Sequence, residues 1–372
     1  MSRKLLVLLL AVAGGCSDKK LEVAVYDGLH GATIANMAAS GVRQSQVAKD
    51  RRFDARSVAQ RAIVRDSLSP EILTASLDSI VEDTLVVALL SRFYMQAAVA
   101  ATSKMKEAGL PFLALHPVAP QLVGGGTTGF ALVPDITKEA AFIAKQVGSG
   151  KRVALIHIDD TYGRDMAAAL VNALTQAGSA PFLVRSYQQS WDEPRMVALG
   201  HDTRSQGPEI MVFAGRSPSL VLVMQPFREA GEEIRVIATD LVESQTTYNN
   251  PDGSLAGVQF VRFLDPTSPD ERMRNLQDRY TFWVGFGEIT SEGVLVYDGM
   301  YLIGEAVRAG ARTRAQVVAY LRSLGRTRPP FSGVSGLIAF GDDGQVQRKM
   351  ELVEVQQRGV TIVATDSAAS RR

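Results

Sequence analysis

The feature that most limits the possible folds of this chain is a regular alternation of short apolar runs with longer amphipathic stretches, which continues almost to its end. Several apolar runs, such as residues 153–156, are continuous rather than alternating, which is typical of strands covered on both faces. The runs predicted to form strands are 21–26, 84–90, 112–115, 152–158, 182–186, 209–213 and 235–239.

The stretches between these runs have the spacing of amphipathic helices. Ser69-Pro70 and Thr137 are residue types that commonly begin a helix. Strands that alternate with helices predict parallel sheets covered on both faces, and the number of units indicates two doubly wound sheets in an α/β protein. The predicted helices are 70–82, 95–108, 138–147, 165–177, 195–205 and 219–230.

Ligands of doubly wound sheets bind at the carboxyl ends of the strands, near the point where the strand order reverses. One loop at such an end holds Asp159 and Asp160, directly before Tyr162-Gly163. Their position favours capping of the next helix over a direct role in chemistry. The loops expected to face a ligand are 27–32, 91–94, 116–129, 159–164, 215–217 and 240–245.

The first sixteen residues have the form of an export signal. Arg3 and Lys4 give a basic start, residues 5–13 are apolar, and small residues precede Cys16. A charged segment, a short apolar segment and small residues before a cleavage site describe a secretory signal. The apolar run is well short of the ~20 residues that a membrane-spanning helix needs. We therefore expect a leader over residues 1–15.

The same residues resemble the lipobox of bacterial lipoproteins, in which the cysteine after the cleavage site carries a diacylglycerol. Ala13 stands where that family most often has leucine, and the other interpretation is an ordinary signal peptide with a chance cysteine. The resemblance implies a lipid anchor on Cys16, a tether over 16–20 and a place in the cell envelope, facing the periplasm or exterior. Two or three acyl chains suffice for stable anchoring without a spanning helix.

Charge and cysteine content exclude two classes of protein. Without the leader, 38 basic residues stand against 39 acidic ones, so no basic excess is present to displace the counterions of a nucleic acid. Cys16 is the only cysteine in the sequence, so no disulfide framework supports the fold. A chain of 372 residues is long enough to divide into two domains with ordinary apolar cores.

The sequence contains no motif that predicts catalysis, a metal or a cofactor. Residues 148–151 are similar in composition to a phosphate-binding loop, but Arg152 replaces the required Ser or Thr and the segment precedes a strand. His157 continues a buried-looking strand and is interpreted as a core residue. The histidines lack the spacing of a helical metal site. They are His30, His116, His157 and His201.

The segment 152–166 resembles the start of the second lobe in type 1 periplasmic binding proteins of the leucine/isoleucine/valine-binding kind. There a strand ends in a short acidic loop and a Tyr-Gly pair, here Tyr162-Gly163, opens a helix. Together with further similar segments in the family's order, the resemblance covers nearly everything after residue 20. These segments are 21–31, 110–122, 209–215, 228–231, 237–240 and 335–344.

The resemblance implies two doubly wound lobes joined by three crossovers, with a solute bound in the cleft between them. Lobe one would comprise 21–135 and 264–339, and lobe two 136–263 and 340–364, followed by a frayed tail at 365–372. Closure of such lobes over a ligand is a hinge motion that is stabilised by contacts of the closed state.

The resemblance also assigns ligand-binding roles to single residues. Asp240 occupies the position of the acid that holds the ligand's α-ammonium group. Tyr162 occupies the position of the aromatic residue that closes over the ligand. The loop expected to supply donors to the ligand's carboxylate consists of Ser91, Arg92, Phe93 and Tyr94.

Two positions depart from the family pattern. In the second donor loop, Pro117-Val118 has valine where the family has threonine, so one expected hydroxyl donor is missing. Arg216 stands near a position that is often aromatic. Arg92 or Arg216 could bind an anionic group of the ligand through a bidentate fork, and the alternative for both is a rim position facing water.

Two functions follow from this resemblance. The first is a lipoprotein that binds an amino acid or a similar small polar solute outside the cytoplasm and delivers it to an ABC-type permease. The second is a lipoprotein of the same fold that senses a ligand, or regulates a process such as cell-wall synthesis through protein contacts. The missing hydroxyl at Val118 leaves room for the second function.

Overall fold

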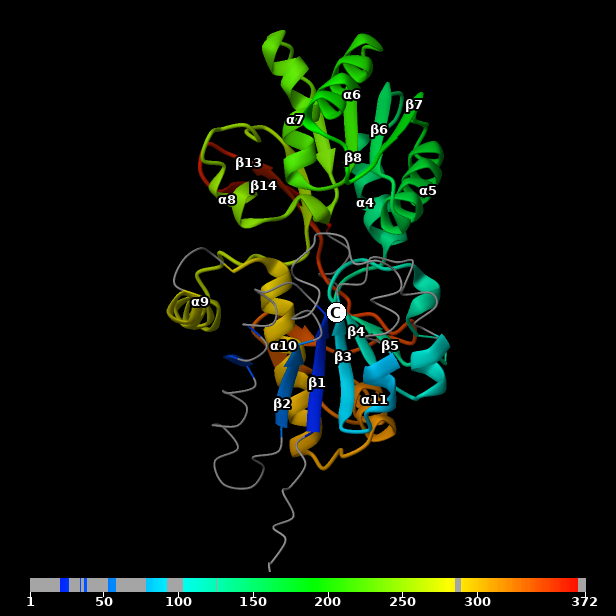
Figure 1. The fold of residues 1–372 in the computed structure, drawn as a ribbon, viewed down its shortest axis with the longest axis vertical. Coiled ribbons are helices and arrows are strands. Elements are labelled where there is room, and N and C mark those ends of the chain that lie inside the picture. The colour runs from blue at the N-terminus through cyan, green and yellow to red at the C-terminus, as the bar shows by residue number, and fades with distance from the viewer. Residues whose placement is uncertain are drawn as a thin grey trace, which may run out of the picture.

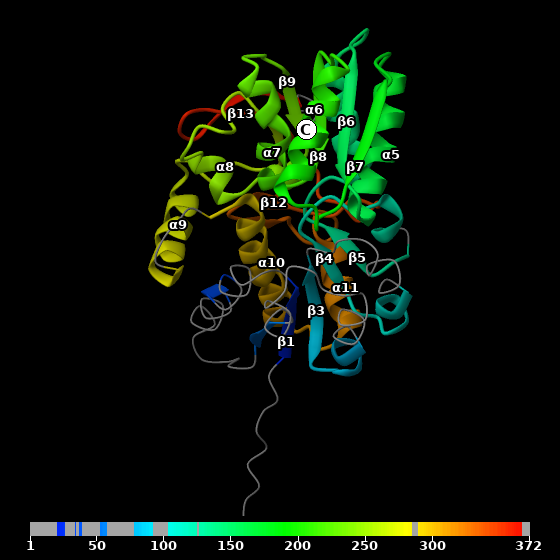
Figure 2. The same ribbon diagram turned by 45° about the horizontal axis from the view of Figure 1, so that its top comes forward.

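A computed structural model of the protein describes residues 21–26, 34, 37–38, 53–57, 78–91, 103–124, 126–284 and 289–366. The expected leader and Cys16 lie outside these ranges, as does the end of the chain from residue 367. The described residues form two lobes, one above the other in Figure 1. Figure 2 shows the same two lobes after a turn about the horizontal axis. Within these ranges, no helix has the length and apolar character needed to cross a membrane.

Lobe one, below in Figure 1, contains a five-stranded sheet in the order β2-β1-β3-β4-β5. All neighbouring strands in it are parallel. Helices α10 (Ser291–Arg308) and α11 (Arg314–Ser323) pack against β3. The strands are β1 (Leu21–Tyr26), β2 (Phe53–Ser57), β3 (Val86–Ser91), β4 (Phe112–Ala114) and β5 (Gly129–Ala131).

Lobe two contains a seven-stranded sheet in the order β14-β13-β10-β9-β8-β6-β7. Its first five strands along the chain are parallel, and the C-terminal β13 and β14 add to it in antiparallel fashion. The strands are β6 (Val153–Ile158), β7 (Leu183–Tyr187), β8 (Ile210–Ala214), β9 (Arg235–Ala238), β10 (Gln259–Arg262), β13 (Glu351–Val355) and β14 (Val360–Thr365).

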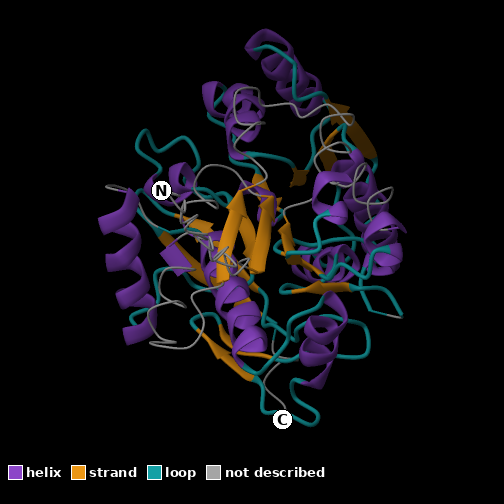
Figure 3. Cartoon of the chain, turned by 60° about the horizontal axis from the view of Figure 1, so that its bottom comes forward, coloured by secondary structure: helices purple, strands orange, loops and turns teal. Residues whose placement is uncertain are grey.

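Helices surround the strands of both lobes (Figure 3). In lobe two, α4 packs against α5 and α6 against α7, while α5 also contacts β6 and β8. These helices and the short α8 are α4 (Ile136–Val147), α5 (Thr161–Gln176), α6 (Glu193–Ser205), α7 (Ser217–Glu229) and α8 (Gln245–Asn249).

The parallel strands of the two lobes follow one topological pattern. In space the parallel strands lie in the order β2-β1-β3-β4-β5 in lobe one and β7-β6-β8-β9-β10 in lobe two. In each lobe the second strand along the chain lies at the edge of the sheet, and the strand order changes direction between the first and third strands along the chain. This confirms the prediction of two doubly wound sheets. It also fixes the switch points, where such sheets bind ligands, at β1/β3 in lobe one and β6/β8 in lobe two.

The starts of α4 and α5 show how the sequence sets the helices. Asp135, and not Thr137, caps α4: its carboxylate accepts the Thr137 N–H at 2.8 Å and the Lys138 N–H at 3.0 Å. The expectation that Thr137 begins this helix was wrong because its hydroxyl also donates to Asp135, at 2.5 Å. Asp160 caps α5 by accepting the Gly163 N–H at 2.8 Å, which confirms its predicted capping role.

The chain passes between the lobes from β5 to α4, from β10 through α9 (Glu271–Val284) to α10, and from the hairpin of β11 (Phe331–Gly333) and β12 (Gly336–Ile338) to β13. The first and third passages are bonded to each other. Gln345 accepts the Asp135 N–H at 3.0 Å and donates to the Asp135 carboxylate at 2.8 Å. They therefore form one connection between the lobes.

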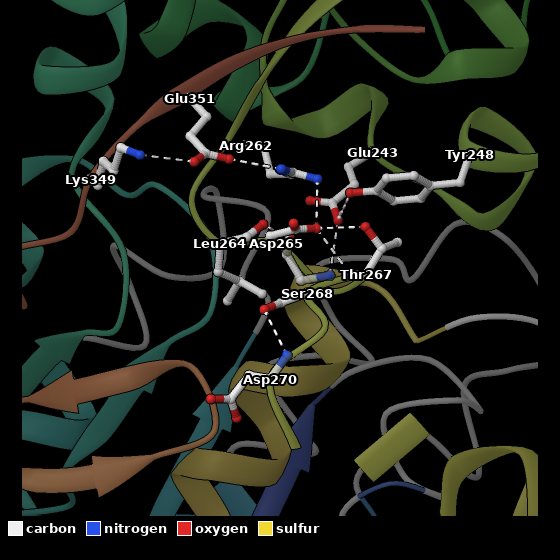
Figure 4. A network of polar contacts seen from close by, with 11 residues as sticks. Glu243, Tyr248, Arg262, Leu264, Asp265, Thr267, Ser268, Asp270, Lys349 and Glu351 are labelled. Carbon is white, nitrogen blue, oxygen red and sulfur yellow. Dashed lines mark hydrogen bonds and ion pairs between the residues drawn. The ribbon is translucent and has the colours of Figure 1, made fainter. Parts of the chain in front are cut away.

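The second passage begins at the buried Arg262, at the end of β10 (Figure 4). Arg262 bonds to Glu351 at 2.8 Å and to Asp265 at 2.9 Å. Glu243 accepts the Ser291 N–H at 2.9 Å, at the first residue of α10, and the Tyr248 hydroxyl at 2.8 Å. This polar network connects lobe two to the first turn of the main helix of lobe one.

Candidate functional site

Tyr162 and Asp240, two of the residues predicted to bind a ligand, are bonded to each other. Tyr162 lies in the first turn of α5, just after β6, and Asp240 begins a 3-10 turn (Asp240–Val242) just after β9. The Tyr162 hydroxyl donates to Oδ1 of Asp240 at 3.2 Å, although 78 residues separate them in the chain. Both side chains therefore lie at the carboxyl edge of the lobe-two sheet, where ligands of this topology bind.

Gly163 allows Tyr162 to take this position. A Cβ atom at Gly163 would lie 1.8 Å from the carbonyl oxygen of Ile158, the last residue of β6. Any side chain would push the first turn of α5 away from the strand. The Tyr-Gly pair therefore holds the tyrosine tightly over the end of β6, and its ring is 1% exposed.

Glu139, on α4, is a third member of this cluster and was not predicted from the sequence. Its Oε1 atom accepts the backbone N–H of Asp240 at 2.8 Å. Its Oε2 atom is buried and has no hydrogen-bond partner among the described residues. The signal that could have revealed it is an acid on the apolar face of a helix, since Ile136, Ala140 and Ile143 are buried beside it.

The pKa values of these side chains reflect burial among like charges. Burial raises the pKa of Glu139 well above its usual range, and the negative charge of Asp240 raises it further, against the opposing Asp240 N–H bond. Burial, followed by the charges of Asp240 and Glu139, raises the pKa of Tyr162 well above 10.0. The phenol of Tyr162 therefore stays a hydrogen-bond donor, and the cluster favours a cation over an anion.

Lobe one reaches this cluster through the segment after β4. The His116 ring is 4% exposed and lies 6.2 Å from the Tyr162 ring, centroid to centroid. Of the predicted donor loop, Pro117 and Val118 are buried, and the Val118 carbonyl accepts the Ile136 N–H at 3.3 Å. The histidine thus contacts the tyrosine from the opposite lobe, which places the cluster between the two sheets.

The other predicted donor loop begins at the end of β3. Ser91 is fully buried, and its hydroxyl has no hydrogen-bond partner within the ranges that the structure describes. Its carbonyl accepts the Leu115 N–H at 3.1 Å, so it lies beside the start of the His116 segment. Arg92, Phe93 and Tyr94 lie outside the described residues.

Arg216 lies at the switch point of lobe two. It is the residue before α7, directly after β8, and its backbone N–H donates to the Tyr187 hydroxyl at 3.3 Å. Burial raises the pKa of Asp160, while the Gly163 N–H and the positive charge of Arg216 act against this rise. The structure therefore brings Arg216 close to Asp160, the residue that caps α5.

Metal binding finds no support in the described ranges, where no three His, Cys, Asp or Glu side chains gather as ligands. The Nδ1–H of the buried His157 donates to the Ile158 carbonyl at 2.9 Å, as expected of a core histidine. The polar groups of the site are thus carboxylates, hydroxyls and an imidazole, which suit recognition of a small polar molecule.

Two parallel α/β lobes that meet at the carboxyl edges of their sheets, with an acidic cluster between them, define a two-lobed solute-binding protein. Residues 63–360 match the family model described as periplasmic binding protein, and the chain belongs to this family. Its members are solute-binding proteins that work outside the cytoplasm.

Individual relatives are more distant. An amino acid binding protein of Pseudomonas aeruginosa is 26% identical over 208 residues, which is 54% of this chain and 55% of that protein. The chain therefore matches little more than half the length of this curated relative.

Solved structures of similar fold match almost the whole chain. A leucine binding protein from Thermotoga maritima is 16% identical, with a TM-score of 0.76, and the match covers 94% of this chain and all (100%) of that one. A solute binding protein from R. palustris in complex with benzoate is 13% identical, with a TM-score of 0.75 and coverage of 93% and 96%. At these identities the likeness concerns the fold alone.

Proposed function

We propose that this protein captures an amino acid, or a similar small polar solute with a protonated amine, between its two lobes and delivers it to an ABC-type permease. The observation that carries the proposal is the bond of Tyr162 to Asp240 beside the buried Glu139. A buried carboxylate requires a paired cation or several donors, and an α-ammonium group supplies both a positive charge and three N–H donors.

The fold by itself does not select such a ligand, since the similar R. palustris protein was crystallised with benzoate, which has no amine. The acidic residues Asp240 and Glu139 of this chain are what favour a ligand with an amine. Asp240 would accept from the ammonium group and Tyr162 would close over it. Relatives named for amino acids and leucine agree with this choice.

The ligand's carboxylate would be held from lobe one. The buried Ser91 hydroxyl at the carboxyl end of β3 and the backbone N–H of Val118, in the segment after β4, would donate to it, together with Arg92. Arg216, beside Asp160, would bind a second polar group near the switch point of lobe two. Val118 offers only its backbone, so Ser91 becomes the main hydroxyl donor of this half of the site.

The membrane anchor and the permease complete the proposal. Acyl chains on Cys16, after removal of residues 1–15, would hold the protein at the membrane through its tether over 16–20. An anchored binding protein stays close to the permease that receives its solute. Mass spectrometry of the protein isolated from membranes would detect the acylated Cys16 peptide, and an unmodified cysteine would contradict the anchor.

A thermal-shift screen of the purified protein against the twenty standard amino acids and a wider set of metabolites tests the function. A ligand at 100 times its Kd adds ~2.7 kcal/mol to the free energy of unfolding, which raises the melting temperature by a readily measured amount. We expect one amine-containing compound to stand out. If no compound in either set shifts the transition, solute capture is refuted.

A further inference from the structure

Glu139 lies where it would contact a ligand bound at the cluster of Glu139, Asp240 and Tyr162. It projects from α4, whose first turn follows the passage from β5, and its carboxyl group is fully buried. One oxygen is occupied by the Asp240 N–H at 2.8 Å, and the other is buried with no hydrogen-bond partner in the described part of the chain. A buried acceptor without a partner costs free energy, so a donor is expected to fill this position in some state of the protein.

The groups around Glu139 do not neutralise it. Asp240, after β9, adds a second carboxyl group, and Tyr162, on α5, contributes a neutral phenol that is bonded to Asp240. His116 contacts that phenol from lobe one. On α4 itself, Lys138 bonds away from the cluster, to Gln345 at 3.0 Å and Asp343 at 2.9 Å. Neither Arg nor Lys bonds to Glu139 within the described ranges.

We propose that Glu139 is a ligand-binding residue which, together with Asp240, receives the protonated amine of the ligand and exchanges its own proton for that amine. The inference rests on the proposed function. It adds a second acid to the binding site, the requirement that the ligand carry a positive charge, and the release of a proton on binding. The buried Glu139 carboxyl group does not ionise beside the half-buried Asp240 carboxylate unless a cation joins them, so the empty site keeps one proton and the filled site does not.

The exchange balances in charge and atoms. In the empty protein the proton sits on the Glu139 carboxyl group. When the ammonium group enters, the O–H bond of Glu139 breaks, the proton passes to water, and the ammonium N–H donates to the freed oxygen. The net charge of the site is then the same before and after binding. The amine stays protonated throughout, since aliphatic amines lose their proton only well above neutral pH.

The experiment measures protons released on binding, by calorimetry of the purified protein in buffers of different ionisation enthalpy. The probe is the amino acid that gives the largest thermal shift in the panel of twenty. Wild-type protein should release a proton, and its affinity should rise up to about tenfold for each pH unit between about 5 and 7. Glu139→Gln keeps an oxygen for the Asp240 N–H but has no proton to release. Its affinity should change less than about twofold over the same range.

Two comparisons isolate Glu139. His116 is present in both proteins, so any proton that it exchanges cancels in the difference between wild type and E139Q. Asp298→Asn removes another buried acid whose pKa burial raises, on α10 among the amides of Val334 and Ser335. D298N should release as many protons as wild type.

The outcomes separate this inference from the proposed function. Binding by wild type without proton release, or equal pH dependence in wild type and E139Q, overturns the role of Glu139 and leaves solute capture standing. Binding of the deaminated carboxylic acid as tightly as the amino acid overturns the charge requirement. Failure of every compound to bind, in the amino-acid set and in the wider metabolite set, refutes the proposed function, and the role of Glu139 with it.

Discussion

The backbone N–H of Asp240 donates a 2.8 Å hydrogen bond to Oε1 of Glu139, 101 residues earlier in the chain. This bond ties the first helix after the passage from lobe one to the strand end that carries the predicted ammonium-binding acid. It also places two carboxyl groups and the Tyr162 phenol in one cluster, in which Glu139 and Tyr162 are buried and Asp240 is half-buried.

Asp240→Asn should weaken amino acid binding at least about 30-fold, because removing one partner of a buried, hydrogen-bonded charge pair costs ~2–5 kcal/mol. The asparagine keeps the backbone bond to Glu139 and an oxygen for Tyr162, so the fold should persist. Calorimetric titration with the ligand found in the screen measures the loss. Asp202→Asn, which removes an exposed acid paired with Arg185 in the same lobe, is the matched control and should bind normally. Wild-type affinity in D240N would place the ammonium group elsewhere.

Tyr162→Phe should weaken binding by about tenfold or more while the ring keeps its packing. The phenol donates to Asp240 at 3.2 Å, and hydrogen bonds to charged groups contribute ~1.5–3 kcal/mol. Without this donor the Asp240 carboxylate loses the group that orients it. Equilibrium titration gives the affinity, and circular dichroism checks the fold. Tyr320→Phe, on α11 in lobe one, should leave affinity unchanged. Equal affinities of Y162F and wild type would exclude a role for the hydroxyl.

Local patterns in the sequence predicted most of the fold. The continuous apolar run at 152–158 corresponds to β6 (Val153–Ile158), whose side chains are all buried. The helix predicted at 195–205 corresponds to α6 (Glu193–Ser205). The elements that were not predicted carry weaker local signals. β5 has only three residues, and β10 ends in the buried Arg262, an unusual residue for a core strand.

The site was predicted only in part, for a physical reason. Asp240 and Tyr162 sit in recognisable local settings, a strand end and a Tyr-Gly helix start, and the structure brings them together. Glu139 has no such setting, because what makes it notable is a partner 101 residues away. Arg262 is similar, since its burial is compensated by Glu351, which is 89 residues later. Long-range pairs of charged residues leave no trace in local periodicity.

Arg262→Ala should destabilise the protein by ~3–5 kcal/mol, because removing one partner of a buried ion pair leaves the other charge uncompensated. Arg262 is 2% exposed and bonds to Glu351 and Asp265 (Figure 4). Urea denaturation measures the free energy of unfolding. Arg326→Ala removes an exposed ion pair with Asp342 and should cost less than ~1 kcal/mol. Similar losses in both variants would show that burial does not determine the contribution of Arg262.

Glu139→Gln should change how stability depends on pH. Burial and the charge of Asp240 raise the pKa of Glu139 above its usual value of 4.5, so above that pH the folded protein binds more protons than the unfolded chain. The protonated Glu139 carboxyl group therefore stabilises the folded protein fully at pH values below the pKa that Glu139 has in the unfolded chain. This stabilisation is lost as the pH rises through the pKa that Glu139 has in the folded protein. The loss is up to ~1.4 kcal/mol for each pH unit, and the glutamine does not titrate.

Urea denaturation at about pH 5 and about pH 7 measures this difference without any ligand. The stability of E139Q minus that of wild type should increase between the two pH values. Asp135→Asn is the control on the same helix. The pKa of Asp135 is lowered, because bonds from Thr137, Lys138 and Gln345 outweigh the opposing effect of burial. Its stabilisation is therefore present above pH 3.8 and lost only in acid, so the D135N difference should stay constant over this range. If the E139Q difference also stays constant, Glu139 is ionised in the folded protein and holds no proton to exchange.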